Sequence, residues 1–128
     1  MGLAIVDKRR PKANMSEVMH VIGDVEGKDC ILFDDMVDTA GSLVGAAKAI
    51  AEIGGAKKIY ACASHGLHSG PAIERLEKSN IVELALLDTI PAHAEAERAR
   101  IRYLTVAPLF AEAIERTYQE ISIAKLFN

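Results

Sequence analysis

The chain has 128 residues, of which 50% are hydrophobic and 26% are charged, and this composition is typical of one small globular domain. Its formal net charge of −3 gives no general attraction to nucleic acid, and no apolar stretch is long enough to span a membrane. The two cysteines lie in apolar runs, so we expect reduced thiols. Residues 1–7 lack the basic region of a signal peptide, so we expect a cytoplasmic protein. We expect one domain over residues 1–128.

Short apolar runs predict strands, whereas apolar side chains at helical spacing predict helices. In chain order, we expect strands at residues 3–6, 30–33, 59–63, 82–87 and 103–106, an extended arm at 15–22, and helices at 43–53, from Pro71, at 92–100 and at 107–119. Pro11 interrupts the basic segment 8–14, which therefore predicts a loop after the first strand. Strands that alternate with helices indicate the α/β class, with a parallel sheet flanked by helices. The continuous apolar run 3–6 suits a strand of this sheet that is buried on both faces.

The segment that follows the second apolar strand and leads into a helix carries the side chains of a ligand site. In an open α/β sheet, ligands bind beyond the carboxyl ends of the strands. Thr39 and Ser42 offer hydroxyls, and Gly41 lets the main chain approach a phosphate closely at the N-terminus of the helix. Asp34 and Asp35 are suited to accept from vicinal ribose hydroxyls, directly or through Mg²⁺.

The same string has a simpler interpretation as a helix cap with turn residues, because Asp, Thr and Ser are common at caps. The two carboxylates argue against this interpretation. Asp34 and Asp35 come directly after a buried apolar strand, and desolvating them without a partner would be costly. They therefore favour a cleft or a ligand at this position.

Residues 34–42 resemble the phosphoribosyl-diphosphate loop of type I phosphoribosyltransferases, in which an apolar strand, two acids and two further residues precede Asp-Thr-Ala-Gly-Ser. Residues 3–14 and 19–24 resemble the catalytic loop region of ribose-phosphate pyrophosphokinases. Further segments that match this family lie at residues 65–66, 69–72, 88–91, 109–114 and 126–127. The resemblance implies the C-terminal part of such an enzyme, with a type I phosphoribosyltransferase-like fold that lacks its first strand–helix unit.

Enzymes of this family move a diphosphoryl group from ATP, with Mg²⁺, to ribose 5-phosphate, and they form phosphoribosyl diphosphate and AMP. The resemblance implies that Lys8 is the catalytic cation and that Arg10 contacts the diphosphate and the ribose phosphate. It implies that Asp34 holds ribose hydroxyls. It implies that the 5-phosphate is held by the residues of the following turn, Asp38, Thr39, Ala40, Gly41 and Ser42. It assigns no metal ligand to this chain.

The family's chains are much longer, and the resemblance implies that most of the ATP site and a metal-binding histidine belong to a missing N-terminal half. We expect the chain alone to bind the sugar phosphate weakly and to have little kinase activity. An apolar sheet edge or face left open should make it self-associate or bind a complementing segment. The resemblance also implies a homo-oligomer, which is a hexamer in the family.

Two other functions stay open. A phosphoribosyltransferase would use the same loop but needs a base-binding hood, and no segment of the sequence supplies one. A non-catalytic subunit would regulate a full-length enzyme, although it would have no need of Lys8, Arg10 and the phosphate loop. Among the histidines, we expect His65 to support the site and His68 to lie exposed in a loop.

Overall fold

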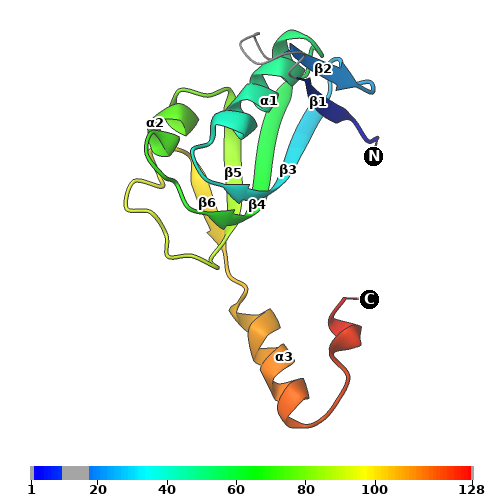
Figure 1. Ribbon diagram of the computed structural model, residues 1–128, viewed down its shortest axis with the longest axis vertical. Coiled ribbons are helices and arrows are strands. Elements are labelled where there is room, and N and C mark those ends of the chain that lie inside the picture. The colour runs from blue at the N-terminus through cyan, green and yellow to red at the C-terminus, as the bar shows by residue number, and fades with distance from the viewer. Residues whose placement is uncertain (1, 10–17, 128) are drawn as a thin grey trace.

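Figure 1 shows a computed structural model of the chain, which describes residues 2–9 and 18–127 but not the side chains at positions 8, 9 and 18. In chain order its elements are β1 (Ile5–Arg9), β2 (Val18–Ile22), β3 (Asp29–Val37), α1 (Gly41–Glu52), β4 (Lys58–Gly66), α2 (Ala72–Glu77), β5 (Ile81–Leu87), β6 (Ile101–Leu104), α3 (Ala107–Tyr118) and a short 3-10 helix, η1 (Ile123–Leu126).

Strands β3, β4, β5 and β6 form one sheet in that order, and each neighbouring pair is parallel. Leu32 of β3 lies opposite Ala61 of β4, and Ala61 lies opposite Leu84 of β5. Leu84 in turn lies opposite Ile101 of β6, so an apolar row crosses the sheet. The predicted α/β class with a parallel sheet is confirmed, and α1 and α2 lie in the crossovers that parallel neighbours require.

One face of the sheet is covered by α1 and α2. Leu43 and Ile50 of α1 belong to one buried cluster with Leu76 of α2. Leu84 and Leu86 of β5 complete this cluster and have no exposed surface. The apolar residues of α1 recur at helical spacing, which turns one side of the helix toward the strands. The core of the domain therefore lies between these two helices and the sheet.

The opposite face of the sheet is open. Side chains alternate along β3, so Ile31 and Phe33 point away from the face that Leu32 joins, and they are 49% and 78% exposed. Helix α3 has no buried residue, and Figure 1 shows that it extends away from the sheet. Its apolar residues Phe110 and Ile114 are exposed as well. An apolar face and an apolar helix stripe thus remain uncovered, whereas the lack of a first strand–helix unit stays a prediction.

The first predicted strand is wrong in its partner and its burial. Residues 3–6 were expected to lie in the parallel sheet, but β1 pairs with β2 in a separate antiparallel sheet of two strands. Ile5 is 54% exposed. A short apolar run does not reveal its partner, and here the alternating segment predicted at 15–22 supplies it. The main chains of Lys8 and Arg9, predicted to lie in a loop, belong to β1.

The charged helix predicted at residues 92–100 does not form, because the segment folds into successive tight turns. The amide of Ala96 donates to the carbonyl of His93 at 3.1 Å. The amide of Arg98 likewise donates to the carbonyl of Glu95 at 3.2 Å. Both bonds span three residues, where an α-helix would use four.

We predict that the open face drives self-association or dye binding, and that Phe33→Ser reduces both. Burying a Phe side chain contributes roughly 1.5–3 kcal/mol, so the substitution should weaken association about tenfold or more. The control is Ile53→Ser, which removes a side chain of 64% exposure beyond the end of α1, away from the open face. Sedimentation velocity and binding of a hydrophobic dye measure the effect, and a monodisperse wild-type monomer that binds no dye would contradict the prediction.

Candidate functional site

The turn between β3 and α1 borders a hollow of about 370 Å³. β3 ends at Val37 and α1 begins at Gly41, so the turn itself is only three residues long. All five residues predicted to hold a 5-phosphate line this hollow, and the full lining is Asp34, Met36, Val37, Asp38, Thr39, Ala40, Gly41, Ser42 and Leu43. The structure therefore brings the predicted phosphate turn together around one concave surface.

The first amides of α1 are not used for hydrogen bonds within the described part of the chain. Ala40 precedes the helix in a left-handed conformation (φ 59°), and its methyl side chain makes no capping hydrogen bond. The amide of Val44 donates to the carbonyl of Ala40 and starts the helical ladder. Within the described residues, no acceptor is found for the amides of Gly41, Ser42 and Leu43. The simpler interpretation as a capped helix does not hold, since the donors that a cap would satisfy are open to a ligand.

The two adjacent carboxylates lie differently from what was expected. The sequence predicted that the second strand ends at Asp34, but β3 continues to Val37, so Asp34 and Asp35 both belong to the strand. Asp34 lines the hollow, whereas Asp35 is not part of its lining. The two acids are also linked locally, because the Asp35 amide donates to Asp34 Oδ1 at 2.9 Å.

The predicted catalytic residues lie largely outside the described part of the chain. Arg10 falls in the segment 10–17, and of Lys8 only the main chain is described, opposite Met19 in the β1–β2 pair. The Met19 methyl group lies 3.0 Å from where a Cβ at Gly45 would stand, so β2 packs on α1 one turn beyond Gly41. The main chain of Lys8 therefore runs beside the helix that the phosphate turn begins.

His65 is held by a side-chain network at the carboxyl end of β4. It lies opposite Met36, and its Nδ1 is 2.7 Å from Thr89 Oγ1. The Thr89 hydroxyl donates its hydrogen to the carbonyl of Ser64 at 2.9 Å, so it can only accept from His65. His65 must then carry its proton on Nδ1 when neutral.

His68 was predicted to be an exposed loop residue, and this is wrong. It is 6% exposed, has a left-handed backbone (φ 55°), and its Nε2 has no hydrogen-bond partner in the described part of the chain. The loop is drawn inward because the amide of Leu67 donates to Val37 and that of Ser69 to Asp38. Burial lowers the pKa of His68, and the nearby His93 ring, 5.9 Å away between centroids, lowers it further.

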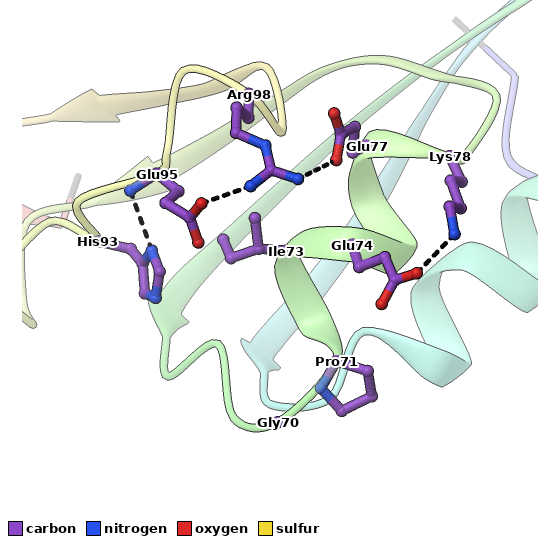
Figure 2. Close-up of a pocket in the computed structure, with 9 residues that line it drawn as sticks. All are labelled: Gly70, Pro71, Ile73, Glu74, Glu77, Lys78, His93, Glu95 and Arg98. Carbon is purple, nitrogen blue, oxygen red and sulfur yellow. Dashed lines mark hydrogen bonds and ion pairs between the residues drawn. The ribbon is translucent and has the colours of Figure 1, made fainter.

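A larger hollow of about 490 Å³ lies between α2 and the turns that follow β5, as Figure 2 shows. Its charges are paired with one another: Lys78 binds Glu74 at 2.5 Å, and Arg98 binds Glu77 at 2.6 Å and also Glu95. These hydrogen bonds lower the pKa values of Glu74 and Glu77. Because its cations are neutralised, this hollow is a poorer anion site than the turn before α1.

One contact to the phosphate turn was not predicted from the sequence. Arg75 of α2 donates from Nη1 to the carbonyl of Thr39 at 3.0 Å. No sequence signal indicates this pair, because it depends on how α2 sits beside the turn in three dimensions.

Comparisons with known proteins match the chain to one family. The family model described as "Phosphoribosyl synthetase-associated domain" matches residues 4–128. The chain is 55% identical over 126 residues to the ribose-phosphate pyrophosphokinase of Clostridium acetobutylicum, covering 98% of this chain and 39% of the relative. It is 58% identical to that of Caldanaerobacter subterraneus subsp. tengcongensis, covering 98% of this chain and 40% of the relative. It thus spans about two fifths of the length of these curated relatives.

A solved structure is also similar. The crystal structure of phosphoribosylpyrophosphate synthetase from Mycobacterium smegmatis matches with a TM-score of 0.76 and 37% identity, over 80% of this chain and 34% of the other. Among the helices that the structure describes, none is long and apolar enough to cross a membrane.

We predict that the buried His68 makes stability depend on pH. Its pKa is lowered on folding, so the unfolded chain binds the proton more readily than the folded chain. The free energy of unfolding should therefore be highest above pH 6.5, the ordinary pKa of the ring, and should fall as the pH drops below it. Urea unfolding between about pH 5 and 8 measures this dependence.

His68→Asn removes the titrating group and keeps a residue that tolerates the left-handed backbone, so this variant should lose most of the dependence. His20→Asn changes an exposed histidine of β2 and should keep it. Equal slopes for wild type and His68→Asn would show the prediction to be wrong.

Proposed function

The chain belongs to the phosphoribosyl synthetase-associated domain family of the ribose-phosphate pyrophosphokinases, and from this premise we propose that it supplies the ribose 5-phosphate site of a ribose-phosphate diphosphokinase. The whole enzyme would transfer the diphosphoryl group of ATP to ribose 5-phosphate and release AMP. We further propose that the chain corresponds to the C-terminal part of such an enzyme, that the first strand–helix unit of its domain lies outside this chain, and that it works in the cytoplasm.

The observation that carries the proposal is the set of open amides at the start of α1. A phosphate placed against Gly41, Ser42 and Leu43 would accept from several N–H groups and would meet the positive end of the helix dipole. The hydroxyls of Thr39 and Ser42 line the same hollow and would add donors. The site therefore matches a phosphate monoester rather than a neutral ligand.

The carboxylates next to the turn support a sugar as the group that carries the phosphate. Asp34 lines the hollow and would accept from the vicinal ribose hydroxyls, while Asp38 lines it nearer the phosphate. Asp35 is not part of the lining, so we propose that it contributes through the field of its charge rather than by direct contact.

We propose that Mg²⁺ binds at this site together with ATP and the sugar. The hollow is lined by two carboxylates, Asp34 and Asp38, and Mg²⁺ commonly binds to one or two carboxylates together with substrate oxygens, so the donor set fits an ion that ATP and the sugar also bind. Asp34 is the lining carboxylate beside the ribose hydroxyls that would contribute a ligand. Bound there, Mg²⁺ would neutralise charge on the diphosphate.

Catalysis would come from the β1 region and from the remainder of the enzyme. Lys8 is proposed to stabilise the charge that develops on the transferring group, and Arg10 to bind the diphosphate and the ribose phosphate. The packing of β2 on α1 supports this assignment, because it places the β1–β2 pair beside the helix that begins at the phosphate turn. ATP is proposed to bind mainly through the part of the enzyme outside this chain, and the complete enzyme to be a homo-oligomer.

We predict that ribose 5-phosphate binds to the wild-type chain and binds at least about tenfold more weakly to Gly41→Val. The added side chain would keep the phosphate from approaching the main chain closely. The hydrogen bonds lost in this way contribute about 1.5–3 kcal/mol each, because the acceptor is charged. A Cβ at Gly41 would meet Arg75 Nη1 at 3.4 Å and Thr39 Oγ1 at 3.7 Å, which are ordinary contacts, so the variant should fold. Calorimetric titration with Mg²⁺ present measures the affinity.

The matched control is Asp29→Ala, which removes an exposed acid from the far end of β3 and should leave the affinity unchanged. Absence of binding to the wild-type chain, or equal affinity of Gly41→Val, would refute the proposed phosphate site.

We predict that the isolated chain forms no AMP from ATP and ribose 5-phosphate, but that it supports activity within a chimera. In that chimera it replaces the matching segment of the Clostridium acetobutylicum enzyme, to which it is 55% identical. Lys8→Ala should lower the rate of the chimera about 10²–10³-fold, as loss of one charge-stabilising donor does elsewhere. Lys57→Ala, at an exposed lysine after α1, serves as the control.

AMP formation at full rate by the isolated chain would contradict the first part of this prediction. An inactive chimera that still binds ribose 5-phosphate would instead favour a non-catalytic subunit.

A further inference from the structure

We propose that Arg75 is a further residue of the anion site, which positions the phosphate turn and places its positive charge beside the bound phosphate. This inference rests on the proposed function, because it assigns a role within the same site. Arg75 lies on α2, more than thirty positions beyond the turn in sequence, and reaches it through tertiary packing.

The guanidinium group lies against the turn and forms one hydrogen bond with it. Its Nη1 donates to the carbonyl oxygen of Thr39 at 3.0 Å, and the same nitrogen lies 3.4 Å from where a Cβ at Gly41 would stand. These two residues stand on either side of Ala40, and all three line the hollow. The positive charge of Arg75 is therefore next to the open amides at the start of α1.

The hydrogen bond to Thr39 fixes the direction of the next amide. The carbonyl of Thr39 and the N–H of Ala40 belong to one planar trans peptide, so they point in opposite directions. Holding the carbonyl toward α2 turns the Ala40 N–H away from the guanidinium. Ala40 is left-handed (φ 59°), a conformation that is uncommon without glycine, and an external hydrogen bond at this peptide helps to maintain it.

The charge of Arg75 is available for a ligand. Within the described residues Arg75 forms no ion pair, whereas Lys78 and Arg98, the neighbouring cations, are paired with glutamates. Helix α2 is packed against the core, because Ile73 and Leu76 on either side of Arg75 are buried. A guanidinium that donates one hydrogen bond to the turn still has further N–H groups that can donate to a phosphate oxygen.

The test compares Arg75→Gln and Arg75→Lys with the wild-type chain in calorimetric titration with ribose 5-phosphate. Arg75→Gln keeps an N–H donor but loses the charge, and it should weaken binding about tenfold or more, as expected for a hydrogen bond to a charged group. Arg75→Lys keeps the charge and should recover part of the affinity. A purely structural role would instead predict equal affinities for the two variants, because both keep an N–H donor. Arg102→Gln, at an exposed cation on β6, is the control and should bind as wild type does.

Amide hydrogen exchange over residues 39–44 is the second measurement. Exchange there should be faster in Arg75→Ala, which has no donor for the Thr39 carbonyl, than in wild type or Arg102→Gln, because the turn loses its tie to α2. Wild-type affinity in Arg75→Gln would overturn the proposal. If the wild-type chain binds no ribose 5-phosphate, the proposed function fails, and exchange then decides about Arg75: unchanged rates overturn its positioning role and faster rates support it.

Discussion

The site depends on amides at the start of α1 for which the described part of the protein supplies no acceptor. Most helices satisfy such donors with a capping side chain, but here Ala40 occupies the capping position and offers none. Its left-handed backbone turns the chain sharply from β3 into α1 and keeps the donors of Gly41, Ser42 and Leu43 on the rim of the hollow. The turn is less stable by itself than a capped one would be. A bound anion would accept the hydrogen bonds that a capping side chain would otherwise accept.

This turn is supported from several directions by the covered side of the domain. The carbonyl of Thr39 is held by Arg75 from α2, and the carbonyl of Asp38 accepts from the amide of Ser69, in the loop after β4. Below the turn, Val37 and Leu43 are buried in the core. A strained turn keeps one conformation only when its surroundings determine it, and these contacts provide that support.

The parts of the fold that follow from local pattern could be predicted from the sequence. The phosphate turn and α1 could be located because an apolar strand, a glycine and a helical repeat occur in a fixed order. The wrong predictions concern the partner of β1, the burial of His68 and the end of β3, which continues past Asp34 and Asp35. Arg75 was missed for the same reason, because its contact with the turn depends on the packing of α2.

The open face and the phosphate turn are largely independent, and this separates binding from catalysis. Among the described residues, the hydrogen bonds that hold the turn come from α2 and from the loop after β4, on the side where the core is complete. The exposed Phe33 points to the other side of the sheet, and α3 is tied at its start by Asp88, whose Oδ1 accepts from the amide of Val106 at 2.8 Å. A partner that covers Phe33 and α3 would therefore not break the hydrogen bonds that hold the turn. On the proposed function, such a chain would keep its affinity for a sugar phosphate, while the transfer step would need ATP, the β1 region and the remainder of the enzyme.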